Sequence, residues 1–103
     1  MPHTVVQYRC TSPETADENQ RLVEDVFSEL EATGATGFSY ASFRLEDGVS
    51  FVHVVVEHAE QGTDLSSVPA FQRFVAGIDR RVDAAPVVRG AQLVGAHRMF
   101  EPG

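Results

Sequence analysis

The stretch FVHVVVEH, residues Phe51–His58, has the composition of a central β-strand. Successive side chains of a strand point to opposite faces, so the residues divide into two sets. Val52, Val54 and Val56 form one set, and Phe51, His53 and Val55 form the other. Both faces are therefore apolar and both need cover, which limits the folds that this chain can adopt.

The rest of the chain supplies two helices and three further strands around this stretch. Turn-forming residues separate the segments, and the predicted helices carry apolar residues at intervals of three and four. Thr15 and Glu18 have the spacing of a capping box at the start of the first helix, which Gly34 and Gly37 end. The predicted segments are strands at Val5–Cys10, 38–45, 49–58 and 87–100, helices at 15–33 and 68–82, and a polar loop from Glu60 to Ser67.

The hairpin between residues 38–45 and 49–58 has two conceivable registers. A two-residue Asp47-Gly48 loop would pair Arg44 with Phe51 and mix polar with apolar side chains on each face. A three-residue loop ending in Gly48 pairs Arg44 with Ser50 instead. We predict the three-residue loop, which places His53 opposite Ala41, on the face that carries Phe43 and Phe51.

The βαββαβ order predicts a single ferredoxin-like α+β domain over residues 1–103: a four-stranded antiparallel sheet with both helices on one face. Two helices can cover only one face of the sheet. An apolar second face is larger than the patches that soluble monomers usually expose, so we predict that a second copy packs against it in a homodimer. The alternative is that the chain termini cover this face.

The composition argues against nucleic-acid-binding and membrane proteins. The net charge of the 103 residues is −7, and all eight basic residues are arginines without a stripe that could follow a phosphate backbone, so nucleic acid is not an expected partner. No apolar run approaches the roughly 18 residues of a membrane span. A single cysteine, Cys10, excludes an internal disulfide. We expect a cytoplasmic protein without membrane contact.

A metal site is not expected either. His53 and His58 lie five residues apart on one strand and face opposite ways. His53 and Glu57 would be roughly 13 Å apart, which is too far for one ion.

The segment SVPAFQRFVAGI, residues 67–78, together with the βαββαβ order and the doubly apolar sheet, resembles the antibiotic-biosynthesis-monooxygenase group of dimeric α+β barrel proteins. The resemblance implies a homodimer. It also implies a relation to oxygenases that act on polycyclic phenols and quinols without metal, flavin or haem, so no cofactor is expected.

The sequence departs from this group at the residues that usually carry its chemistry. The oxygenases commonly use a tryptophan and an asparagine, but this chain has no tryptophan. Its asparagine, Asn19, falls in the polar first turns of the first helix. The haem-degrading relatives pair a tryptophan with a histidine, where this chain has the segment from His58 to Gly62. No catalytic residue is therefore assigned by motif.

His53 is the candidate general base. Oxygenation without a cofactor needs a base that makes an electron-rich anion, and a half-buried imidazole is neutral and able to accept a proton near pH 7. The alternative is a core histidine that is hydrogen-bonded to a nearby group.

Tyr40 and Arg44 lie two residues apart on one strand face and could orient an anionic oxygen. They could equally be an interface aromatic residue and an arginine that reaches water at a strand end. His97, about two strand spacings or roughly 10 Å from His53, could line the same pocket. The predicted pocket residues are Phe43, Phe51, Phe71, Phe74 and His97.

These residues favour a cofactor-independent monooxygenase that acts on an aromatic, polyketide-like or quinol compound, with His53 as base and Tyr40 or Arg44 assisting. The alternative is a dimer without catalytic activity that binds an apolar or aromatic small molecule or serves as a scaffold.

Overall fold

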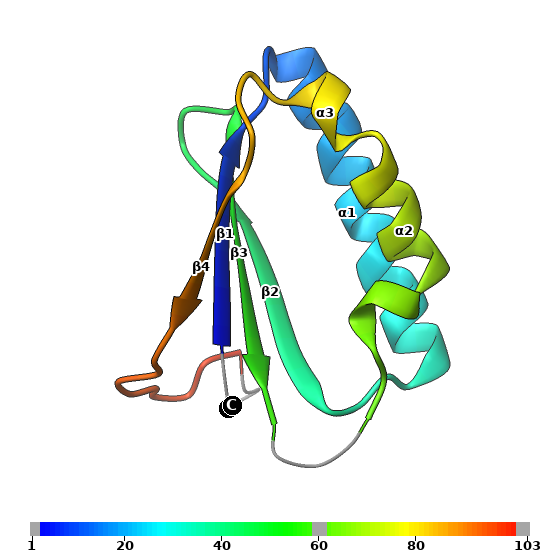
Figure 1. The fold of residues 1–103 in the computed structure, drawn as a ribbon, viewed down its shortest axis with the longest axis vertical. Helices are drawn as coiled ribbons and strands as arrows, with labels where there is room; N and C mark the ends of the chain where they lie inside the picture. The colour runs from blue at the N-terminus through cyan, green and yellow to red at the C-terminus, as the bar shows by residue number, and fades with distance from the viewer. Residues whose placement is uncertain (1–2, 59–61, 101–103) are drawn as a thin grey trace.

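The computed structural model describes residues 3–58 and 62–100 and confirms the ferredoxin-like α+β fold. Four antiparallel strands lie in the order β2-β3-β1-β4, and the helices cover one face of the sheet (Figure 1). In the described residues, no helix is long and apolar enough to cross a membrane. The elements are β1 His3–Arg9, α1 Pro13–Thr33, β2 Phe38–Arg44, β3 Ser50–Glu57, the 3-10 helix η1 Leu65–Ser67, α2 Pro69–Ala76, α3 Ile78–Arg81 and β4 Val87–Ala91.

Helix α1 begins two residues earlier than the sequence pattern predicts. Its N-cap is Ser12, whose hydroxyl accepts a hydrogen bond from the backbone N–H of Thr15. The Thr15 hydroxyl in turn accepts from the backbone N–H of Ser12. The capping box is therefore Ser12 and Thr15, and the predicted pairing of Thr15 with Glu18 is wrong. The helix ends as predicted at Gly34, whose φ of 64° is the left-handed cap that glycine adopts without strain.

The second half of the chain has shorter helices and a shorter last strand than predicted. The helix expected over residues 68–82 is divided at Gly77 into α2 and α3. Of the predicted loop from Glu60 to Ser67, residues 60 and 61 lie outside the described residues, and residues 65–67 form η1. The last strand ends at Ala91 instead of Phe100. The segment after β4 bends back toward the lower end of the sheet (Figure 1).

The predicted hairpin register is wrong. Arg44 pairs with Phe51 and Ser42 pairs with His53, so His53 does not lie opposite Ala41. The loop is organised by Asp47, whose carboxylate accepts hydrogen bonds from the backbone N–H groups of residues 49 and 50. A hydrogen bond from the Ser50 hydroxyl, together with these two backbone bonds, lowers the pKa of Asp47 to about 2. The register puts Arg44 on the face that packs against the helices.

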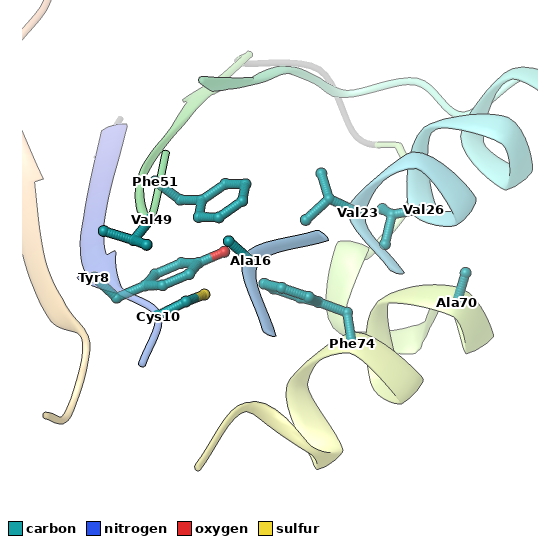
Figure 2. Packing of buried hydrophobic residues seen from close by; sticks show 9 residues of the cluster. All are labelled: Tyr8, Cys10, Ala16, Val23, Val26, Val49, Phe51, Ala70 and Phe74. Atoms are coloured by element: carbon teal, nitrogen blue, oxygen red, sulfur yellow. The ribbon is translucent and has the colours of Figure 1, made fainter. Parts of the chain in front are cut away.

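The core lies between the sheet and the helices. Figure 2 shows Tyr8 and Phe51 projecting from the sheet toward residues of α1 and α2, among them Val23 and Phe74. Tyr8 stacks on Phe51 with ring centroids 5.5 Å apart. The core therefore forms on the face that carries His53, a choice between two apolar faces that the alternation in β3 leaves open.

The opposite sheet face carries the predicted apolar row of Val52, Val54 and Val56, with Gln7 and Arg89 beside it on the neighbouring strands. No helix covers it within the described residues. The segment after β4 lies against part of this face, because Leu93 and Met99 line a hollow together with Val54 and Val56.

Candidate functional site

A cavity of about 250 Å³ opens between the sheet and helix α2 on the core face. Its walls are almost entirely apolar. The polar side chains that reach it are those of Tyr8, Tyr40 and His53. Apolar walls with a few convergent polar groups are typical of small-molecule sites. The apolar walls include Leu65, Phe71, Phe74, Val75, Ile78 and Val88.

His53 is held by a tyrosine at each ring nitrogen. Its Nε2 lies 2.7 Å from the Tyr8 hydroxyl, and its Nδ1 lies 2.7 Å from the Tyr40 hydroxyl. The register positions all three, because Tyr8, Tyr40 and His53 come from three adjacent strands and point to the same face. The ring packs near Phe74, with centroids 5.5 Å apart. Only 3% of His53 is exposed, so the imidazole is both satisfied and fixed in orientation.

The hydrogen bonds continue from Tyr8 into the helices. Asn19 Nδ2 donates to the Tyr8 hydroxyl (2.8 Å), and Arg81 Nε donates to Asn19 Oδ1 (2.9 Å). Arg81 also donates from Nη2 to the backbone carbonyl of Phe74 (2.6 Å) and lies over the Phe74 ring. Asn19 and Arg81 are 0% and 3% exposed. A buried cation is thereby joined to the cavity by side chains alone.

Burial sets the protonation states of this network. It lowers the pKa of His53 from 6.5 to about 4, so the imidazole is neutral at pH 7. Burial also raises the pKa of Tyr8, against the opposing effect of the Asn19 hydrogen bond. It raises the pKa of Tyr40, and the nearby Tyr8 acts in the same direction. At neutral pH, the three cavity groups are therefore two phenols and a neutral imidazole.

The structure brings together four of the eight residues predicted for the site. His53, Tyr40, Phe71 and Phe74 all line the cavity. Phe51 is on the same sheet face but is fully packed in the core, 2% exposed, where it stacks on Tyr8.

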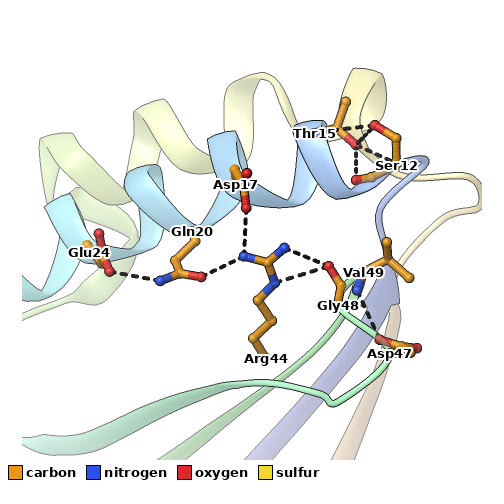
Figure 3. Close-up of polar contacts among 9 residues, drawn as sticks. All are labelled: Ser12, Thr15, Asp17, Gln20, Glu24, Arg44, Asp47, Gly48 and Val49. Atoms are coloured by element: carbon orange, nitrogen blue, oxygen red, sulfur yellow. Dashed lines mark hydrogen bonds and ion pairs between the residues drawn. The ribbon is translucent and has the colours of Figure 1, made fainter.

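Arg44 lies away from the cavity. Its guanidinium donates to the Gly48 carbonyl, to Asp17 and to Gln20, and so ties the hairpin to α1 (Figure 3). Its position at the strand end, with an ion pair to the exposed Asp17, matches the alternative of an arginine that reaches toward water.

Phe43 and His97 lie on the other side of the sheet. Phe43 faces away from the helices and packs near Phe100, with ring centroids 6.1 Å apart. His97 lines the hollow beneath Val54 and Val56. Both were placed with His53 by the sequence interpretation, Phe43 through the incorrect register and His97 through a last strand that ends before it.

Sequence reasoning missed Tyr8, Asn19 and Arg81. Asn19 does not lie on a polar turn: it falls in line with Ala16, Val23 and Val26, the buried stripe of α1. This three-and-four spacing was available from the sequence and would have placed the amide in the core. The indication that Arg81 is buried is weaker: it follows Ile78 by three residues and Phe74 by seven, a helical spacing.

Metal-binding side chains do not gather at this site. Across residues 3–58 and 62–100, no three His, Cys, Asp or Glu side chains are close enough to hold an ion together. Cys10 is buried, 1% exposed, and burial raises the pKa of its thiol.

Comparison with known proteins gives a clear result for structure only. Neither a protein-family model nor a curated protein matches the sequence. A solved structure described as an antibiotic biosynthesis monooxygenase matches with a TM-score of 0.62 and 19% identity, over 92% of this chain and 100% of that one. The chain has the fold of antibiotic-biosynthesis-monooxygenase-like proteins.

Two other structures with this fold illustrate its range. Rv0793 from Mycobacterium tuberculosis matches with a TM-score of 0.69 and 14% identity, over 93% of this chain and 98% of that one. A dimeric ferredoxin-like protein of unknown function from Thermobifida fusca matches with a TM-score of 0.59 and 12% identity, over 89% and 90% of the two chains. At these identities, the antibiotic-biosynthesis-monooxygenase-like fold is shared, and the chemistry must be argued from the site.

Proposed function

We propose that the protein is a cofactor-independent monooxygenase that acts on an aromatic, polyketide-like or quinol compound bound in the cavity beside His53. The observation that carries the proposal is a neutral histidine, linked to a tyrosine hydroxyl, in an otherwise apolar cavity. Apolar walls keep water from a reactive anion, and a neutral imidazole can take up the proton whose loss creates that anion.

In the proposed reaction, an activated ring CH₂ or phenol loses its proton toward the Tyr40 hydroxyl, which passes its own proton to Nδ1 of His53. The resulting carbanion or enolate transfers one electron to dioxygen, and the two radicals combine to form a C–O bond. The peroxide then takes a proton and loses water. For a CH₂ group, the balance is CH₂ plus O₂ to C=O plus H₂O, with the substrate as the reductant.

Oxygen uptake by the purified protein tests this proposal directly. With a panel of anthrones and hydroquinones, we expect protein-dependent consumption of dissolved oxygen that falls at least about 100-fold in His53→Ala, the size typical of a lost general base. Tyr40→Phe should lower it similarly. His97→Ala, a histidine outside the cavity, is the matched control and should keep the activity. Full activity in His53→Ala would exclude the role assigned to the imidazole.

A binding protein without catalytic activity is the second candidate. The observation that favours it is that both nitrogens of His53 already have tyrosine partners, so the imidazole is not directly open to a ligand. Tight binding of an aromatic compound without oxygen uptake would select this candidate.

The proposed assembly is a homodimer formed through the outer sheet face. Three features support it: the apolar row of Val52, Val54 and Val56, the absence of a covering helix among the described residues, and the exposed large apolar side chains of the segment after β4. Val94 is 95% exposed and Phe100 is 69% exposed. Packing two such faces together would remove this apolar surface from water.

Light scattering after size exclusion should show a dimer at micromolar concentration. Val54→Lys places a charge at the centre of the outer face and should produce a monomer that remains folded by circular dichroism. Arg21→Glu, an exposed charge change on α1, should leave the dimer intact. A wild-type protein that stays monomeric at this concentration would show that the segment after β4 is sufficient cover.

A further inference from the structure

We propose that the cavity binds a ring compound through an acceptor oxygen, and that Tyr40 donates the hydrogen bond to this oxygen at the end of a one-way chain of donors that starts at Arg81. This inference rests on the proposed ligand site and adds the chemistry of the ligand's polar atom. The atom would be a ketone, quinone or phenolate oxygen.

The direction of the chain is set at its helical end. A guanidinium has donors and no acceptor, so the oxygen of the Asn19 amide must face Arg81. The amide nitrogen then faces Tyr8 and donates to its hydroxyl. One lone pair of the Tyr8 oxygen is thereby occupied, and the Tyr8 proton is directed elsewhere.

His53 then allows two proton arrangements. In the first, the Tyr8 hydroxyl donates to Nε2 and the N–H at Nδ1 donates to Tyr40, which leaves the Tyr40 proton without an acceptor. In the second, the N–H at Nε2 donates to Tyr8 and the Tyr40 hydroxyl donates to Nδ1, which leaves the Tyr8 proton without an acceptor. The two tyrosine hydroxyls and the imidazole N–H are three donors, but only two hydrogen bonds join these three side chains. One phenolic proton is therefore unused in either arrangement.

Burial selects the first arrangement. Tyr8 is 7% exposed, and its hydroxyl already contacts Asn19 and His53. Tyr40 is only partly buried, and in the described residues its hydroxyl has His53 as its single hydrogen-bond partner. A donor left unused in a buried position is costly, so the unused proton belongs on Tyr40. Every bond then points from the Arg81 cation to the cavity, an alignment in which each bond strengthens the next.

This resting arrangement is compatible with the proposed proton transfer. Reversal of the two His53 bonds makes the Tyr40 oxygen an acceptor for a substrate proton. After that transfer, Nδ1–H again donates to Tyr40, and Tyr40 donates to the new substrate anion. The full donor chain thus describes the free protein. In the state that holds the anion, the imidazolium donates to both tyrosines, and the bonds from Nδ1 to Tyr40 and from Tyr40 to the ligand keep their direction. Asn19 and Arg81 act as positioning residues.

The test compares two ligands of nearly equal shape, 1-tetralone with one ketone oxygen and tetralin with none. Titration calorimetry without oxygen should show tetralone binding about tenfold more tightly, the effect of one buried hydrogen bond. Its C=O stretch should move to lower frequency on binding. In Tyr40→Phe, which retains the ring packed on Phe27, both the preference and the frequency change should disappear.

Two further variants test the direction and the remote cation. Tyr8→Phe breaks the chain between Asn19 and His53, so it should reduce the preference for tetralone as far as Arg81→Met does, without removing it. Arg81→Met should reduce both the preference and the frequency change, while its exposed neighbour in Arg80→Met should not. Loss of the preference in Tyr8→Phe with retention in Tyr40→Phe would reverse the proposed direction. Equal affinities, or no binding of either compound, would overturn the ligand class. None of these measurements requires turnover, so this inference and the oxygenase proposal can fail independently.

Discussion

A decrease in pH from 7 to 4 should remove about 3 kcal/mol from the unfolding free energy through His53 alone. Burial holds the pKa of this imidazole at about 4 in the folded protein, against 6.5 when it is exposed. Between these two pH values, the unfolded chain binds a proton on His53 and the folded protein does not. The contribution is therefore fully present above pH 6.5 and is lost as the pH falls toward 4.

The measurement is urea unfolding at several pH values for the wild-type protein and His53→Gln. Glutamine can donate to one tyrosine and accept from the other but does not titrate. Between pH 7 and pH 4, the unfolding free energy of the wild-type protein should fall by about 3 kcal/mol more than that of the variant. The comparison removes the effects of other titrating groups, which are common to both proteins. Parallel curves would mean that water reaches His53 in the folded protein.

The alternation of side chains in β3 predicted correctly which residues lie on which sheet face. This prediction depends only on the period of two in a strand, so it holds whatever register the hairpin adopts. It placed His53 on the face with Phe51 and the three valines on the other, as observed. The fold followed from this pattern together with the order of the elements.

The hairpin register could not be predicted by the same rule. The prediction avoided pairing Arg44 with Phe51 because it treated an arginine as incompatible with an apolar face. In the structure, the arginine stem lies along that face and the guanidinium lies 5.8 Å from the centre of the Phe51 ring. Its donors reach Gly48 and helix α1 at the edge of the core. A long side chain at a strand end can thus belong to an apolar face.

Only part of the candidate site could be predicted, because the sequence does not show which polar side chains meet in the core. His53 stood out because it is a polar residue in an apolar run, and the aromatic residues of α2 followed from helical spacing. Arg81 lies in a segment rich in polar residues, where a single buried position does not stand out. The spacing of Asn19 indicates that it is buried but not which group it meets. Its contact with Arg81 joins residues 62 positions apart in the sequence, which is a property of the folded structure.

Replacement of Asn19 by leucine should lower the unfolding free energy by about 3 kcal/mol. Leucine fills a similar space but leaves Arg81 Nε without its acceptor in a site that is 3% exposed. Arg81→Met should lower it by about 2 kcal/mol, since the Asn19 oxygen and the Phe74 carbonyl lose their donor.

The combined variant provides the decisive comparison, because removal of both partners leaves fewer buried groups unpaired than removal of either one. In the double variant Asn19→Leu/Arg81→Met, the loss of unfolding free energy should therefore be about 2 kcal/mol smaller than the sum of the two single losses. The measurement is urea unfolding, in which the slope of the unfolding free energy against urea concentration should not change between variants. Arg80→Met, the exposed neighbour, should have little effect and no coupling to Asn19. If the two changes simply add, Arg81 and Asn19 stabilise the fold independently. Coupling of the expected size would show that a buried cation is retained in this core because the hydrogen-bonded chain leading to the cavity satisfies it.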